Sequence, residues 1–286
     1  MVIRNTRRVT IELPRRAAIR PSVNFGPLTR QLVNEGAAIW GDSYLARQSY
    51  ADECERLLSF LAARQELNRF RPRLVSRRQQ RDEALNEIRV AYFLDRSGCP
   101  VVGWEVTDAA PYNVEFEVSL GQGANAFVEV KSPGWEAELS RLELDQGRAK
   151  QEKYAGIESR AASPIEVIRR TVKKALPKFT GNAPSLIVIA DDCFVSLGEW
   201  GWAPPMMALI LGSQGYGDGL FRNPDYSKVG AVCLFREREN DTGVNYASIC
   251  ITNPNAMPSA ALPADVAAGI CTEPAPDLTD PNLPWL

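Results

Sequence analysis

The alternation of apolar and polar residues marks two neighbouring strands in the middle of the chain. The segments 112–118 and 126–131 both have the pattern of strands, and the glycine-containing stretch 121–125 between them suits a hairpin turn. Apolar runs later in the chain predict three more strands, at 186–190, 229–235 and 246–251. The last two are close enough in sequence to form a second hairpin.

Helical periodicity predicts helices before and after these strands. The best defined spans about residues 82–95, where apolar residues recur every three or four positions and Gly98 follows the last turn. Two more are expected within 27–68, and another begins at Pro164. This order predicts an α/β fold with a central mixed β-sheet of about four to six strands, flanked by helices, and an N-terminal helical extension.

Composition divides the chain into three parts. Residues 1–80 predict an N-terminal arm and an Arg-rich helical region, residues 81–256 the α/β core, and residues 257–286, rich in proline and alanine, an extended tail. The span 196–228 is rich in glycine, proline and aromatic residues. We expect it to stack on bases, to cover a cleft or to form a homodimer contact.

Composition also excludes several kinds of chemistry. The chain of 286 residues has no histidine, so Ser-His and Cys-His catalysis and histidine–zinc sites are ruled out. Its six cysteines form no Cys-x-x-Cys pair, which predicts reduced thiols in a cytoplasmic protein. No apolar run reaches the roughly eighteen residues of a membrane span, and the N-terminus lacks the apolar core of a secretory signal.

Arginine is concentrated in the first part of the chain. The net charge is −2, yet residues 1–81 hold sixteen arginines, no lysine and seven acidic residues. The guanidinium fork binds phosphate bidentately, so we expect this region to contact nucleic acid, with Arg73, Arg77 and Arg78 as candidates. The alternative is a linker whose arginines pair with acids elsewhere in the fold.

The helix that begins at Pro164 carries a second basic face. Its members are Arg169, Arg170, Lys173, Lys174 and Lys178. Such a face suits a nucleic-acid backbone. A solvated lysine face on a core helix is the alternative.

Candidate catalytic side chains gather on the central helix and strands. Glu87 lies at the border of the apolar face of the central helix. Glu129 and Lys131 are two residues apart in a strand, so their side chains leave the same face, while the neighbouring valines leave by the other. A charged pair on one face of an apolar strand is costly to bury unless something compensates it. A divalent metal and a phosphate would do so.

The first strand offers Glu115 as its acid, and Asn113 and Glu117 lie on the same strand face two residues to either side. Only one of them can lie directly opposite Glu129 in the paired strand. We favour Glu115, because Phe116 and Val118 then turn into the core.

A helix acid, a strand acid, a hairpin and a Glu-x-Lys in this order resemble the PD-(D/E)XK nuclease superfamily, which has the restriction-endonuclease-like fold. Glu87 matches the helix acid, Glu129 and Lys131 match the Glu-x-Lys, and the resemblance covers about residues 81–135. The family usually has Asp on the first strand, where this chain has Glu115. The resemblance implies a restriction-endonuclease-like core.

The resemblance also implies a metal-dependent nuclease that hydrolyses phosphodiester bonds in DNA, in a setting such as restriction or phage defence. Glu115, Glu129 and the Val130 carbonyl would hold Mg²⁺ or Mn²⁺, and Glu87 would hold a second metal or orient a water. Lys131 would position the attacking water and stabilise the phosphate. Two alternatives stay open: a nuclease-like nucleic-acid-binding or scaffold protein whose site has decayed, and an RNA nuclease on the same fold.

Overall fold

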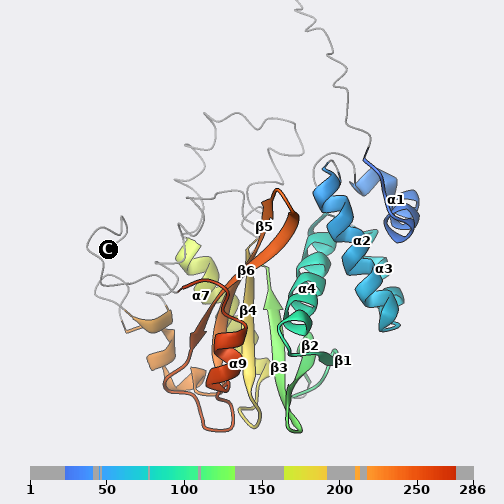
Figure 1. Ribbon diagram of the computed structural model, residues 1–286. Helices are drawn as coiled ribbons and strands as arrows, with labels where there is room; N and C mark the ends of the chain where they lie inside the picture. Colours follow the sequence, from blue (N-terminus) through green and yellow to red (C-terminus); the bar gives the residue numbers. More distant parts are fainter. Residues whose placement is uncertain are drawn as a thin grey trace, which may run out of the picture.

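A computed structural model of the chain describes residues 23–40, 45, 47–76, 78–108, 111–132, 164–191, 210–212 and 218–274. The strands of this part form a six-stranded sheet in the order β1-β2-β3-β4-β5-β6 (Figure 1). Their bounds are Val101–Trp104, Phe116–Gly121, Ala124–Lys131, Ser185–Asp191, Ala231–Asn240 and Gly243–Thr252. β3, β4 and β5 run parallel, and the other neighbouring pairs are antiparallel. The expected α/β class with a mixed sheet is confirmed.

Each face of the sheet is buried under its own set of helices, because the side chains of a strand alternate between faces. In β4, Leu186 and Val188 belong to one core and Ile187 and Ile189 to the other. This double burial explains the continuous apolar run that predicted the strand.

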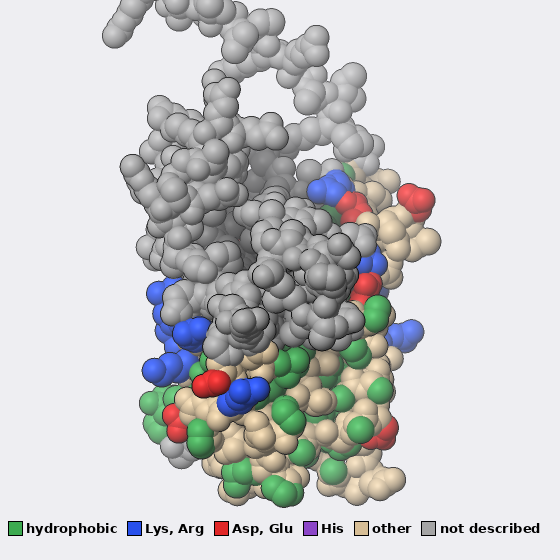
Figure 2. All heavy atoms as spheres, turned by 90° about the vertical axis from the view of Figure 1, so that its left-hand side faces the viewer, with side chains coloured by type: hydrophobic (Ala, Val, Ile, Leu, Met, Phe, Trp, Pro, Cys, Tyr) green, Lys and Arg blue, Asp and Glu red, His purple; other side chains and the backbone are tan. Residues whose placement is uncertain are grey.

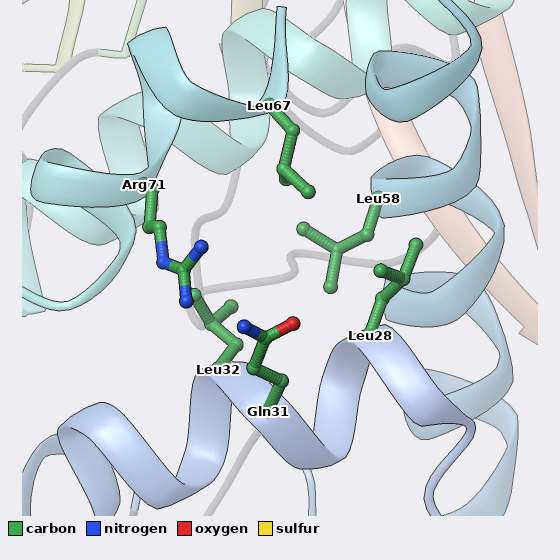
Figure 3. A pocket seen from close by; sticks show the side chains of 6 residues that line it. All are labelled: Leu28, Gln31, Leu32, Leu58, Leu67 and Arg71. Carbon is green, nitrogen blue, oxygen red and sulfur yellow. The ribbon is translucent and has the colours of Figure 1, made fainter. Parts of the chain in front are cut away.

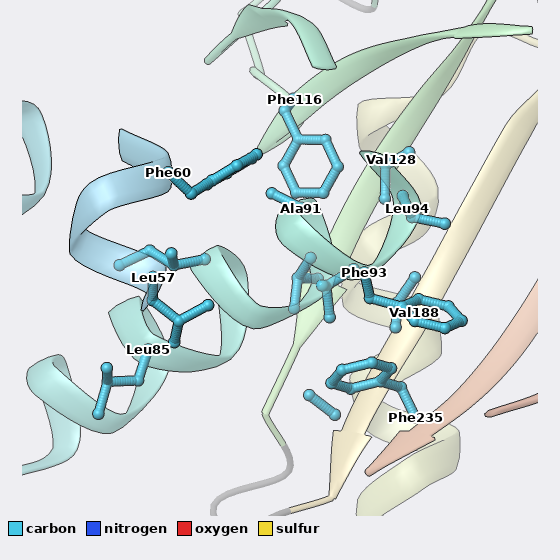
Figure 4. Close-up of a cluster of buried hydrophobic side chains, with 14 of the residues drawn as sticks. Leu57, Phe60, Leu85, Ala91, Phe93, Leu94, Phe116, Val128, Val188 and Phe235 are labelled. Atoms are coloured by element: carbon cyan, nitrogen blue, oxygen red, sulfur yellow. The ribbon is translucent and has the colours of Figure 1, made fainter. Parts of the chain in front are cut away.

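The first face is covered by α4 (Arg78–Arg96) and, nearer the C-terminus, by α9 (Ala264–Gly269) (Figure 1). Figure 4 shows Ala91, Phe93 and Leu94 of α4 among side chains of the sheet, including Phe116 and Phe235. The periodicity that predicted a helix over 82–95 is therefore the pattern of its buried side. The helix itself begins four residues earlier.

The second face is covered by α7 (Pro164–Ala175), by η2 (Leu176–Lys178) and by two further 3₁₀ turns, η3 (Leu220–Arg222) and η4 (Pro224–Tyr226). Phe221 and Tyr226 are buried in this core. These two aromatic residues of the span 196–228 are thus packing residues, and the expectation that the span stacks on bases is wrong for them.

Three helices precede the core: α1 (Pro27–Trp40), α2 (Gln48–Ala63) and α3 (Leu67–Leu74). α2 and α3 pack against α4, α1 packs against α2, and the apolar side chains of all three join the core of the first face (Figures 1 and 4). α1 and α2 confirm the two helices expected within 27–68, and α3 is a third that the sequence did not predict; together they form a layer continuous with the core.

A buried ionic network connects α2 and α4 to the hairpin formed by β5 and β6. Arg89 of α4 is 4% exposed and donates to both carboxylate oxygens of the fully buried Glu53, at 3.0 and 2.9 Å. Arg89 also pairs with Glu237 of β5, and the Tyr246 hydroxyl of β6 donates to Glu53 at 2.7 Å. Glu53 and Glu237 share the Arg89 guanidinium, and the Tyr246 hydroxyl supplies Glu53 with a further donor, so the buried carboxylate is compensated within the fold.

Two expected boundaries need correction. The strand expected over 112–118 begins at Phe116, because the preceding residues leave β3 and stay bonded to the segment after β1: the Val114 amide donates to the Val106 carbonyl at 2.9 Å. The tail expected to be extended from residue 257 is folded as far as residue 274. Ala260 and Ile270 are buried there, and the Thr272 amide donates to the Ser248 carbonyl.

Some expectations concern residues outside the described ranges, among them Arg77, the arm at 1–22 and much of the span 196–228. Of the cysteines, those the structure describes are all free thiols, as expected. Within the described residues no helix is long and apolar enough to cross a membrane.

Candidate active site

The C-terminal end of β3 holds the Glu-x-Lys pair on one face. The Glu129 side chain is fully buried, and Lys131, with its side chain 24% exposed, contacts Glu129 Oε1 through its ammonium group. Val130 points the opposite way, into the core of the first face. The same-face placement predicted from the spacing of the two residues is confirmed.

Glu115 lies next to this pair. The ladder between β2 and β3 ends with Phe116 opposite Val128; Glu115 immediately precedes Phe116, outside that ladder, and its charge acts on Glu129. Glu117 is turned to a different partner, since it accepts a hydrogen bond from the Asn125 side chain at 2.9 Å.

A second lysine, which the sequence placed only on a basic helix face, completes the group. Lys178 Nζ lies 2.8 Å from Glu129 Oε2, 2.6 Å from Glu129 Oε1 and 3.5 Å from Glu115 Oε1. One ammonium group therefore bridges the two carboxylates. Pro177 is the signal that could have revealed this, because proline interrupts a helix and changes the direction of the residue that follows.

Glu87 is buried, but it belongs to a different pair. Arg73 of α3 donates to both of its carboxylate oxygens, at 2.5 Å each. Burial, with a smaller contribution from the charge of Glu115, raises the pKa of Glu87 to about 7 in spite of these hydrogen bonds. The adjacent Asn86 donates to Ser132 at 2.9 Å and so ties α4 to the residue after Lys131.

The electrostatics of the group reflect burial opposed by close ion pairs. Burial is the main cause that raises the pKa of Glu129; the charge of Lys131 lowers it and that of Glu115 raises it. For Lys178, burial lowers the pKa, but the combined effect of Glu129 and Glu115 is larger and the pKa is raised. The charge of Glu115 therefore raises the pKa of both Glu87 and Glu129.

The donor set suits a small divalent cation. Glu129 Oε1 is buried and touches both ammonium groups, yet it has no hydrogen bond of good geometry in the described part of the chain. In the same part, no three acidic, cysteine or histidine side chains gather as a metal-binding group. Mg²⁺ is often held by one or two carboxylates with several waters, so the Glu115 and Glu129 carboxylates would suit it. Both oxygens of Glu87 are already held by Arg73.

The Arg-rich region pairs largely with acids of the fold. Besides Arg73, arginines of this region that form ion pairs include Arg47 with Glu239, Arg64 with Asp95, Arg69 with Glu66 and Glu105, Arg71 with Glu35, and Arg81 with Asp82. This matches the alternative of internal pairing that the sequence left open. The side chain of Arg78 lies outside the described part.

The basic face of α7 is different in character. Arg169, Arg170, Lys173 and Lys174 are all exposed, while Val172 and Ala175 of the same helix are buried. Figure 2 shows Lys and Arg side chains gathered along one border of the described surface on this side of the molecule. This face meets the requirement for contact with a polyanion.

A small depression far from these carboxylates needs no functional account. It lies between α1, α2 and α3 and is lined mainly by leucines, with Arg71 at one side (Figure 3). It has room for about one water molecule, and Arg71 is already paired with Glu35.

Comparison with protein-family models, curated proteins and solved structures finds no match to this chain. The interpretation of the site therefore depends on its geometry and on the pattern of residues described above.

Proposed function

We propose that this protein is a metal-dependent nuclease that hydrolyses phosphodiester bonds, with DNA as its substrate. The observation that carries the proposal is the meeting of Glu115, Glu129 and Lys131 at one end of the sheet, where two lysine ammonium groups contact the buried Glu129 carboxylate. The order of elements supports it. Glu87 on α4, Glu115 beside β2, the hairpin and the Glu-x-Lys of β3 follow the pattern of the PD-(D/E)XK superfamily.

Each residue has a role that its position allows. Glu115 and Glu129 would hold the ion, and a bound Mg²⁺ would supply a Lewis acid and lower the pKa of a water molecule. Lys131, partly exposed at the end of β3, is placed to donate to a substrate phosphate and to orient the attacking water. Glu87 lies on α4 with both oxygens held by Arg73 of α3, and a role in holding a second metal or orienting a water stays part of the proposal.

The substrate would approach along α7. Its basic face is exposed, and η2, which follows it directly, places Lys178 at the carboxylate pair. On this proposal a phosphate backbone bound to α7 would extend towards Lys131. DNA in a restriction or phage-defence setting and RNA share this backbone chemistry. The choice of DNA comes from the resemblance.

A second function is favoured by one observation. The ammonium of Lys178 already neutralises Glu115 and Glu129, as would suit a nuclease-like nucleic-acid-binding or scaffold protein whose catalysis has been lost. The Glu in place of the usual Asp points the same way.

Incubation of the protein with plasmid DNA and Mg²⁺, with and without a chelator, tests the proposal. We expect cleavage that needs the metal and is lost in Glu129→Gln. Binding of DNA without any cleavage by the wild type would favour the second function, and faster cleavage of a matched RNA would reassign the substrate.

A further inference from the structure

The bridging position of Lys178 is the most informative feature that the proposed function does not use. Its ammonium contacts Glu129 Oε2 at 2.8 Å and Glu115 Oε1 at 3.5 Å. A cation shared by these two carboxylates would have to lie in the same place. One positive group or the other can occupy it, since two cations this close would repel each other strongly.

The residues on both sides of Lys178 anchor its backbone. Leu176 and Phe179 are buried in the core of the second face, which fixes the 3₁₀ turn against the sheet. Thr180 donates through its amide and its hydroxyl to the Asp108 carboxylate, at 2.7 and 2.8 Å. The backbone of Lys178 is therefore anchored, while its long side chain, 21% exposed, can move.

The local charges balance without a metal. Glu115 and Glu129 contribute two negative charges, and Lys131 and Lys178 contribute two positive ones. A divalent ion entering this group would give it an excess of positive charge unless an ammonium group left. Lys178 is the one that bridges both carboxylates.

We infer that Lys178 is an internal counter-ion of the site, which occupies the cation position between Glu115 and Glu129 and must swing away before a divalent metal binds. The inference rests on the proposed function, because it takes these two carboxylates as the metal ligands. The anchored backbone lets the side chain leave and return without unfolding the turn. The Lys178 side chain is 21% exposed, so its ammonium group, once released from the carboxylates, can reach solvent and a substrate phosphate.

The first test measures Mn²⁺ and Mg²⁺ affinity by calorimetry, without nucleic acid. Lys178→Gln should bind the metal at least about tenfold more tightly than the wild type, because one competing charge is gone. Lys174→Gln, which removes an exposed charge four residues earlier on α7, should leave the affinity unchanged. Lys178→Arg keeps the positive charge and should stay near the wild type.

The second test uses the wild type, so it does not depend on a variant that folds. The protein is treated with an amine-acetylating N-hydroxysuccinimide ester, and the modification of each lysine is followed by mass spectrometry. Adding Mn²⁺ should increase acetylation of Lys178 severalfold, with the same half-saturation as binding, because its amine leaves the carboxylates. Lys174, already exposed, is the internal reference.

Unchanged metal affinity in Lys178→Gln, or unchanged acetylation of Lys178 at a saturating metal concentration, would overturn the inference. If the wild type still cuts DNA with Mg²⁺ in that case, the proposed function stands and the counter-ion role fails. If Glu129→Gln added to Lys178→Gln leaves the tighter binding intact, the metal binds elsewhere and both proposals fail.

Discussion

Arg73 holds both carboxylate oxygens of Glu87, each at 2.5 Å, and so joins α3 to α4 beside the candidate active site. The sequence assigned the two residues to different tasks, nucleic-acid binding for Arg73 and metal chemistry for Glu87. As a pair they connect two helices and neutralise a buried carboxylate, so substitutions of either residue should change the stability of the protein.

Arg73→Ala should destabilise the protein by about 2 kcal/mol near pH 8, with allowance for the partial exposure of Arg73, because it leaves the Glu87 carboxylate buried without its partner. Urea unfolding measures this. Arg71→Ala breaks a far more exposed pair and should have a much smaller effect. Equal losses in the two variants would contradict the structural role of Arg73.

The stability contributed by Glu87 should depend on pH in a defined direction. Its pKa is raised from 4.5 to about 7, mainly by burial, so the folded protein binds this proton more tightly than the unfolded chain. The free energy of unfolding, taken relative to Glu87→Gln, should be highest below pH 4.5 and fall by on the order of 3 kcal/mol as the pH rises to about 7. A flat difference between the two proteins over this range would show that Glu87 is not buried as described.

Glu115→Gln and Glu117→Gln separate the two acids near the start of β2. Glu115 shares Lys178 with Glu129, whereas Glu117 bonds to Asn125. We expect Glu115→Gln to lose metal-dependent cleavage by about a hundredfold and Glu117→Gln to keep most of it. Glu115→Asp, the usual residue of the family, is the conservative control. The reverse result would assign the ligand to Glu117.

The salt dependence of nucleic-acid binding should come from α7. Changing Arg170, Lys173 and Lys174 together to Gln should flatten the slope of log affinity against log salt by about 0.9 for each duplex phosphate contact that is lost. Arg73→Ala should leave the slope near that of the wild type, because Arg73 is engaged by Glu87. If only the Arg73 variant flattens the slope, the Arg-rich region is the binding surface after all.

The buried network of α2 and α4 should control global stability. Arg89→Met leaves Glu53 without its main counter-charge in the core and should cost about 3–5 kcal/mol in the free energy of unfolding. Tyr246→Phe removes one hydrogen bond to Glu53 and should cost about 1 kcal/mol. Comparable losses in the two variants would mean that the ion pair contributes no more than the hydroxyl.

Local periodicity was enough to predict the central helix and the face that the Glu-x-Lys pair shares. The periodicity of 82–95 predicted α4, and the two-residue spacing of Glu129 and Lys131 predicted their common face. These features are local, since the repeat of a helix or strand fixes which side chains point the same way. Such periodicity can be recognised in a sequence wherever one face of a helix or strand is buried.

Only the tertiary structure decided which charges meet. Lys178 contacts Glu129, which is 49 residues away in the sequence, and Arg73 of α3 donates to Glu87 of the neighbouring helix α4. Such contacts depend on how a 3₁₀ turn packs on the sheet and how α3 crosses α4, which no local pattern specifies. A lysine on a helix face and a lysine at a carboxylate pair look alike in sequence, because the difference between them is the direction of one turn and the burial of its neighbours.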